Sequence, residues 1–266
     1  MRFMIIRKAD QATEAGSPPS AGTLAAMAKY SEELEAAGAA CAGLVLHPSS
    51  KGVRMHFRDG EQTMSEGPFT EEKELVAGFA MMEAESQQEA IAWLKRWPAQ
   101  DNELTLEVRG SGCPGGLEGV SLTRAAADTE QRRFVVMLKS SPLAETGAIP
   151  SDKVLAAMAG RNAEGVQAGV MIAGEGLQIT ASGARVKFSG GKSTVLDGPF
   201  SETKELIAGY WLIQAKSMAG AIDWVKRYPY PFIEDAQVEI RPVQEGLDVA
   251  AAVVPGIARA RKSLPV

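Results

Sequence analysis

The sequence predicts an α+β protein made of two tandem copies of one domain. Three observations support this fold class. A long part of the chain returns at a constant offset, so both halves share one design. Within each half, short apolar runs alternate with segments of helical periodicity. Their order is strand, helix, strands, helix, strand, which is the split βαβ arrangement of an antiparallel sheet with both helices on one face.

Matching segments define the internal repeat. Residue 67 becomes residue 198 in the longest match, an offset of 131. Because the matches extend over most of each half, chance does not explain them. The matched segments are 67–79 with 198–210 and 90–98 with 221–229, and, after one inserted residue, 107–109 with 239–241.

The first half of each copy predicts a strand, a helix and a β-hairpin. In the first copy, the apolar run at 3–6 predicts a buried strand. Ser20 is a good N-cap for the following helix, and Gly38 is a suitable residue to end it. A strand is expected near 42–46. The alternation over 53–57 predicts another strand, and a further short strand leads into the Gly-Pro-Phe turn.

The second half of each copy predicts a strand, a second helix and a last strand. In the first copy the strand covers 75–82. Ser86 and Glu89 form a capping box that opens the helix, and the alternation over 104–109 predicts a half-buried last strand. This ferredoxin-like order leaves one sheet face uncovered. We therefore expect the two copies to pack sheet to sheet as a pseudo-symmetric pair.

The repeat also sets the expected domain boundaries. We predict a first domain over 1–110, a linker over 111–130, a second domain over 131–243 and a C-terminal tail over 244–266. The linker begins rich in Gly, Ser and Pro and then becomes rich in Ala. The tail is rich in Ala and carries a basic stretch, so it is either a docking helix or disordered.

Composition excludes several classes of protein. A net charge of −5 with a pI of 5.3 argues against a nucleic-acid partner, since such binders neutralise phosphates with basic residues. No apolar run approaches the roughly 20 residues of a membrane span. The start of the chain does not resemble a signal peptide, so we expect a cytoplasmic protein. Cys41 and Cys113 are expected to be reduced thiols.

Two segments carry a family signature. Residues 195–205, VLDGPFSETKE, resemble the motif of the DGPF or YCII-related family, and 46–54, LHPSSKGVR, resembles the hairpin before it. The resemblance implies a dimeric α/β barrel made of two ferredoxin-like units, with a cleft between helices and sheet edges. The wider superfamily includes small enzymes that act on aromatic or lactone-like metabolites. Some members have a proposed His–Asp pair, and related proteins are often encoded beside alternative sigma factors.

The candidate catalytic residues are His47, Glu66 and Asp197. The second copy has Asp197 where the first has Glu66, and Gln178 where the first has His47. A carboxylate could orient the imidazole of His47 for acid–base work, or a carboxylate held at the rigid turn could itself act. The alternative is structural: a tight Gly-Pro turn whose Phe anchors it in the core.

The candidate ligand-binding residues lie at equivalent places in the two copies. Their cationic members could bind an anionic group of a substrate; the alternative is a solvated or salt-bridged face. Two histidines without cysteine partners argue against a zinc site, and we expect no metal. The candidates are Arg54, Arg185, Lys73, Lys204, Phe69 and Phe200.

Two functional hypotheses follow. The first is a cofactor-independent enzyme of acid–base type, isomerase-like or lyase-like, that acts on a small molecule in a cleft of the first copy. No cofactor motif is visible. The alternative is a non-catalytic ligand-binding or protein-interaction module, in one version linked to transcription regulation. In both, the chain is a pseudo-dimer, and a further homodimer is open.

Overall fold

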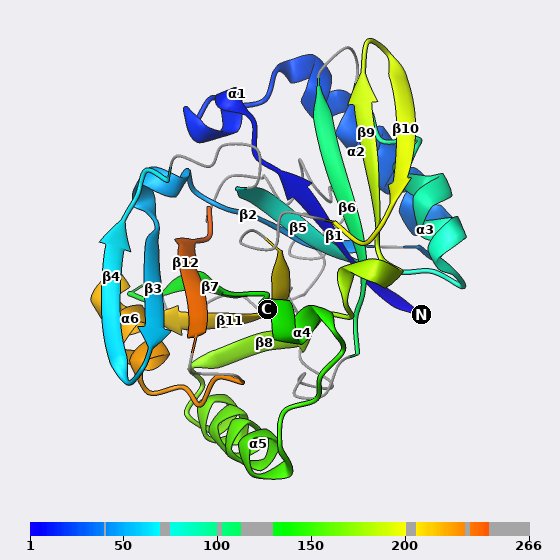
Figure 1. The fold of residues 1–266 in the computed structure, drawn as a ribbon. Coiled ribbons are helices and arrows are strands. Elements are labelled where there is room, and N and C mark those ends of the chain that lie inside the picture. The colour runs from blue at the N-terminus through cyan, green and yellow to red at the C-terminus, as the bar shows by residue number, and fades with distance from the viewer. Residues whose placement is uncertain are drawn as a thin grey trace, which may run out of the picture.

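The structure is a computed structural model, and it describes residues 1–39, 41–69, 75–99, 103–112, 130–200, 206–231 and 235–244. In this part of the chain, the strands form two six-stranded antiparallel sheets, and helices accompany each sheet (Figure 1). The α+β class and the two tandem copies are thus confirmed. The predicted linker over 111–130 and tail over 244–266 lie almost entirely outside the described residues.

Both copies show the same order of elements. The first copy contains β1 (Arg2–Lys8), α1 (Gln11–Glu14), α2 (Ala21–Ala36), β2 (Cys41–Val45), β3 (Val53–Arg58), β4 (Glu61–Glu66), β5 (Val76–Glu83), α3 (Gln87–Leu94) and β6 (Leu104–Gly110). The second copy contains β7 (Arg132–Lys139), α4 (Pro142–Glu145), α5 (Asp152–Gln167), β8 (Met171–Gly176), β9 (Ala184–Ser189), β10 (Lys192–Asp197), β11 (Ile207–Ala215), α6 (Met218–Lys226) and β12 (Asp235–Pro242).

The helix caps follow the sequence with one change. Ser20 and Ser86 accept hydrogen bonds from the backbone N–H groups of Thr23 and Glu89, as N-caps do. The carboxylate of Glu89 accepts from the N–H of Glu85, so it does not close the predicted box on Ser86. The short helices α1 and α4 were not predicted, because four residues carry no helical periodicity.

The two copies exchange their β-hairpins. One sheet has the order β10-β9-β6-β1-β5-β2 and the other β4-β3-β12-β7-β11-β8. The β3–β4 hairpin of the first copy therefore extends the second copy's sheet, where Met55 pairs with Val238. The β9–β10 hairpin extends the first copy's sheet, where Val186 pairs with Leu106. In Figure 1 the cyan β3 and β4 lie beside the orange β12.

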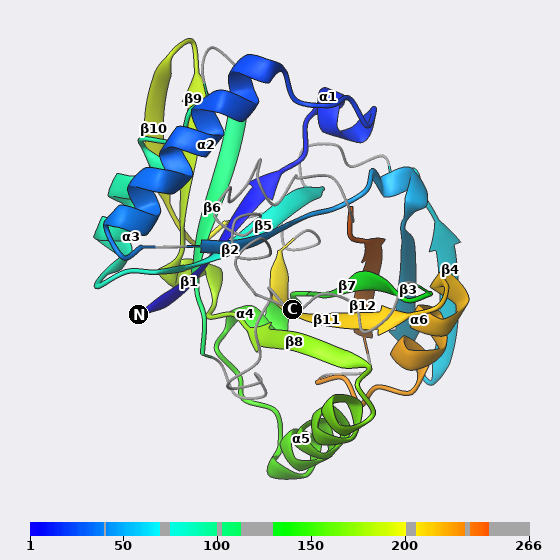
Figure 2. The ribbon, with the colours of Figure 1, turned by 180° about the vertical axis from the view of Figure 1, so that it is seen from behind.

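Three apolar layers hold the molecule together. One lies between α2, α3 and the first sheet, and Figure 2 shows α2 crossing this face near β6 and β9. A second lies between α5, α6 and the other sheet, and contains Trp224. The third lies between the two sheets and draws on both copies, from Met4 and Phe79 to Met137 and Tyr210. The expected sheet-to-sheet packing of the copies is thus observed.

The two sheets also meet at two corners. Isolated β-bridges join Leu46 to Val243 and Ser111 to Leu177. Main-chain hydrogen bonds support each bridge, including one of 3.0 Å from the N–H of His47 to the carbonyl of Pro242. Because each corner has only a single bridged pair, the described strands form two sheets joined at corners and not one closed barrel. No helix in the described ranges is long and apolar enough to cross a membrane.

Candidate functional site

The Gly-Pro-Phe turns are built by packing. A Cβ atom on Gly67 would lie 1.9 Å from the carbonyl oxygen of Ser49, and one on Gly198 would lie 1.8 Å from that of Thr180. Only glycine fits such an approach. Both Gly-Pro peptide bonds are cis. The phenylalanines that follow are buried, as the structural interpretation of the turn predicts.

The predicted ligand-binding arginines stack on these phenylalanines. The guanidinium carbon of Arg54 lies 4.0 Å from the ring centre of Phe69, and Arg185 lies 4.0 Å from that of Phe200. Each arginine also bonds a carboxylate of the other copy. The Nε of Arg54 lies 3.0 Å from Glu239, and the Nε of Arg185 lies 2.9 Å from Glu107. These four predicted residues therefore lie at the junctions between the copies; Lys73 and Lys204 fall outside the described residues.

Two equivalent charge clusters complete the junctions. The first cluster is Lys8, Glu107, Arg109 and Arg185, and the second is Lys139, Glu239, Arg241 and Arg54. The cations within each cluster lie 2.9 to 3.4 Å from the carboxylate. Both glutamates are fully buried.

The cations control the protonation of these glutamates. Burial alone would raise the pKa of Glu239, but Lys139, Arg241 and Arg54 outweigh it and lower that pKa to about 2. Burial would likewise raise the pKa of Glu107, and its own cations lower it to about 2. Both carboxylates are therefore charged at neutral pH, so the clusters are ion networks that join the copies.

The candidate catalytic residues lie at the end of β4, at the end of β10 and two residues beyond β2. The carbonyl of His47 accepts from the Nε of Arg241 at 3.0 Å, and the carbonyl of Gln178 accepts from Arg109 at 3.1 Å. His47 and Gln178 thus share one role, which is to bind an arginine through the main-chain carbonyl and not through the side chain. Glu66 and Asp197 are exposed at the ends of β4 and β10, and the described contacts include no hydrogen bond or ion pair between either carboxylate and His47.

The environment of His47 is cationic. Burial lowers the pKa of its imidazole, and Lys51, Arg241 and Arg132 lower it further. A carboxylate partner would raise that pKa instead. In the described structure the predicted pairing of His47 with Glu66 is therefore not seen.

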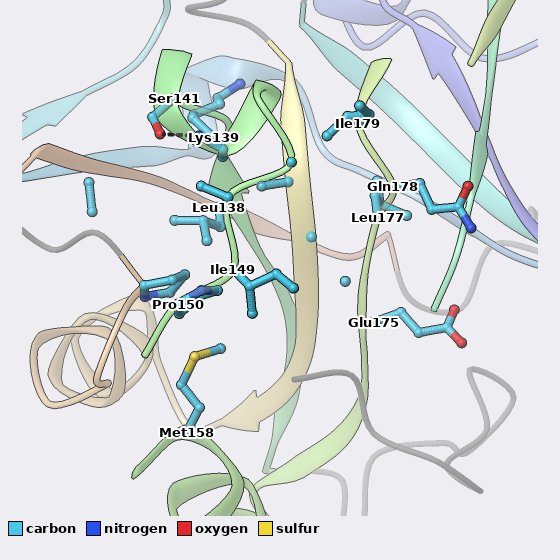
Figure 3. A pocket seen from close by; sticks show the side chains of 18 of the residues that line it. Leu138, Lys139, Ser141, Ile149, Pro150, Met158, Glu175, Leu177, Gln178 and Ile179 are labelled. Atoms are coloured by element: carbon cyan, nitrogen blue, oxygen red, sulfur yellow. Dashed lines mark hydrogen bonds between the residues drawn. The ribbon is translucent and has the colours of Figure 1, made fainter. Parts of the chain in front are cut away.

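The described structure has a cavity that the sequence analysis did not predict. It has a volume of about 170 Å³ and lies over the second copy, between the end of its sheet and the segment that joins α4 to α5. Figure 3 shows the side chains of Leu138, Pro150 and Met158 on one side of β11. The polar ends of Glu175 and Gln178 point away from them. The lining further includes Ser141, Ala144, Ile149, Leu177, Ile179, Ala208, Trp211, Pro231, Asp235 and Ala236.

Three polar side chains around the cavity already have partners. Ser141 caps α4 by accepting from the N–H of Ala144 at 3.1 Å. Lys139 extends to Glu239, 3.2 Å away, and Asp235 pairs with Arg58 at 2.9 Å. The cavity therefore presents a mainly apolar surface. The described residues include no group of three or more side chains suited to hold a metal ion.

The first copy has different residues at the equivalent positions. Arg7 replaces Leu138, and Ala80 replaces Trp211, at the repeat offset of 131. Arg7 pairs with Asp10 at 3.2 Å, so this region of the first copy is ionic. Aligning the two copies by this offset could have indicated the cavity, because its apolar residues change character between them.

Comparison with known proteins identifies the family. The model of the YCII-related domain matches residues 1–109 and again residues 133–245. The chain belongs to the YCII-related family. It is also similar to an uncharacterized protein of Rhizobium meliloti (strain 1021), 34% identical over 64 residues, which are 24% of this chain and 52% of that protein. The match thus spans about half the length of this relative.

The family signature has a structural role in this YCII-related chain. Gly198 admits the carbonyl of Thr180, and Phe200 supports Arg185, which reaches Glu107 of the other copy. The same chain of contacts runs from Gly67 through Phe69 to Glu239. The motif therefore builds the junction between copies, and its described residues do not line the cavity.

Proposed function

We propose that this YCII-related protein binds a compact, mainly apolar small molecule in the cavity of its second copy. The cavity itself carries the proposal. Apolar cavities of about 150 Å³ lined by aliphatic and aromatic side chains stay dry and bind ring-sized ligands. Here Leu138, Met158 and Trp211 supply such a lining. A ligand pocket with mostly apolar walls is also the usual form of a small-molecule site.

Binding is favoured over acid–base catalysis by the placement of the titratable groups. His47 and Glu66 share no described contact, and Ser141, Lys139 and Asp235 at the cavity have partners already. The cofactor-independent enzyme predicted from the sequence, with His47, Glu66 and Asp197 in its site, remains a prediction. Turnover that is lost in a His47→Ala variant would support it.

The proposed function includes the finer fold. We infer that β1, β2, β5, β6, β7, β8, β11 and β12 act as one eight-stranded pseudo-dimeric barrel around the apolar layer between the sheets. The two corner bridges, Leu46 to Val243 and Ser111 to Leu177, support this inference. Such a barrel would fix the end of β8, which forms one wall of the cavity.

A titration with fluorobenzene, followed by ¹⁹F NMR, tests the proposal. We expect saturable binding to the wild-type protein and none to Leu138→Arg, which gives the second copy the residue of the first. Leu196→Arg is the matched control, since Leu196 is an exposed leucine on β10. Equal binding to Leu138→Arg and the wild type would contradict the proposal, and so would no binding at all; the latter would favour the interaction module.

A further inference from the structure

Glu175 is a carboxylate that only the second copy has. It lies near the end of β8 and pairs across the strands with Tyr210, whose ring belongs to the layer between the sheets. Its Oε1 lies 2.6 Å from Nη1 of Arg2, a residue of the first copy. The equivalent residues of the first copy are Leu44 and Phe79. The fold therefore does not require a carboxylate here.

The second oxygen of this carboxylate has no partner among the described residues. Oε2 of Glu175 is buried, and no described group donates a hydrogen bond to it. A buried acceptor without a donor costs stability, more so when it is charged. Burial accordingly raises the pKa of Glu175, and Arg2 only partly opposes it. A costly residue that the other copy lacks points to a role outside stability.

The position of Glu175 connects the first copy to the cavity wall. Residues 175–179 all line the cavity. Two main-chain hydrogen bonds hold the end of β8 against residues 110–112. The N–H of Gln178 donates to the carbonyl of Gly110 at 2.8 Å, and the N–H of Gly112 donates to the carbonyl of Gly176 at 3.3 Å. The carbonyl of Arg2 accepts from the N–H of Ser111 at 3.0 Å. The Arg2–Glu175 ion pair thus adds a side-chain contact to the main-chain hydrogen bonds that hold this wall of the cavity.

We propose that the Arg2–Glu175 ion pair regulates ligand binding in the second copy's cavity. The proposal rests on the proposed function. Ionised Glu175 holds Arg2 and keeps the end of β8 in the binding geometry. Protonation releases Arg2, and the wall loses its preorganisation. Within the described residues, Arg2 from β1 is the charged group that acts on Glu175. Tyr210 from β11, which faces Glu175 across the strands, stays neutral in this pH range because burial raises its pKa well above the ordinary value.

The expected signature is an affinity that depends on pH. The raised pKa of Glu175 places its titration closer to neutral pH than that of an ordinary carboxyl. Fluorobenzene does not titrate, so its dissociation constant reports the protein alone. As the pH falls from about 8 into the acid range where Glu175 becomes protonated, we expect the wild-type affinity to fall roughly fivefold or more, in the usual range of coupling between sites.

Glu175→Gln tests the proposal directly, with Glu164→Gln as control. Gln cannot titrate, so the variant is expected to show one low affinity throughout this pH range. Glu164 forms an exposed ion pair with Arg161 on α5. Its variant is expected to follow the wild-type profile. Circular dichroism establishes that each variant is folded; if Glu175→Gln is not, Arg2→Gln keeps the carboxylate and is expected to bind weakly at every pH.

Each outcome has a separate meaning. A wild-type affinity that is constant with pH would overturn the regulation and leave the proposed function standing. A Glu175→Gln profile, or in its place an Arg2→Gln profile, equal to that of the wild type would do the same. Fluorobenzene that binds at no pH would overturn both proposals.

Discussion

The two copies match at their junctions and differ around the cavity. Glu107 in the first copy and Glu239 in the second are both fully buried and bound by three cations. Beside these clusters, Leu138 of the second copy corresponds to Arg7 of the first, and Trp211 to Ala80. Within one chain, therefore, the shared residues mark the assembly of the copies, and the differing residues mark the candidate site.

The largest expected effect comes from breaking a charge cluster. Glu239→Gln would leave buried cations without their shared carboxylate, which typically costs about 3–5 kcal/mol. Urea denaturation at neutral pH measures this loss. Glu107→Gln is the matched test in the other cluster and should cost a similar amount. A loss below about 1 kcal/mol for only one of them would show that the two junctions are not equivalent, and so small a loss for both would contradict the role of the clusters.

The same carboxylates predict how stability depends on pH. The pKa values of Glu107 and Glu239 are lowered to about 2 from an ordinary value of 4.5. Their contribution is therefore fully present above the ordinary value and is lost as the pH falls towards 2. Denaturation curves of the wild type and Glu239→Gln should accordingly converge in acid. Parallel curves would contradict the role of the ion network.

The next effect concerns the cavity wall. Trp211→Ala gives the second copy the residue of the first, and truncation of a buried tryptophan costs about 3 kcal/mol or more. Because Trp211 lines the cavity, the variant should also bind fluorobenzene more weakly. Thermal unfolding and the ¹⁹F titration measure the two effects separately. Undiminished binding would place the ligand away from Trp211.

A smaller effect is expected from the reciprocal change in the first copy. Arg7→Leu removes the partly exposed pair with Asp10 and also removes a buried Nε atom that makes no hydrogen bond within the described part of the chain. Exposed ion pairs contribute about 0–1 kcal/mol, so the free energy of unfolding should change by less than about 1 kcal/mol. Denaturant unfolding measures it. A large loss would show that Arg7 supports the first copy as the charge clusters do.

The smallest effect is expected from His47→Gln, which copies Gln178. The pKa of His47 is lowered from 6.5 by burial and by three cations. The unfolded chain thus binds a proton more readily, and wild-type stability should decline as the pH falls below about 6.5. The variant should match the wild type within about 0.5 kcal/mol at pH 8 and lose this part of the decline. Unfolding midpoints across this pH range measure it.

Local patterns predicted much of the fold. The apolar run at 3–6 and the capping serines Ser20 and Ser86 gave the elements, because strand alternation and helix capping depend on near neighbours. The offset of the repeat gave the sheet-to-sheet pairing. The exchange of the hairpins was not predicted, since Met55 would pair equally well by pattern with a strand of its own copy. In a tandem repeat, the sheet that a hairpin extends depends on how the two copies pack, and local sequence patterns do not contain this information.

The candidate site was harder to predict. His47 and Glu66 have side chains suited to acid–base chemistry, whereas Arg54 and Phe69 stack at a junction, which their residue types do not indicate. A cavity is a space that side chains leave unfilled, and no single residue type indicates such a space. The change from Arg7 to Leu138 was visible in the sequence, but its meaning needed the packing around it.

A crystal structure under xenon pressure tests the central claim most directly. Xenon occupies apolar cavities of this size and has no charge to direct it elsewhere. The account predicts a xenon atom among Leu138, Met158 and Trp211, and none at the equivalent Arg7, Met27 and Ala80. An empty cavity in the second copy, or xenon in the first copy instead, would contradict it.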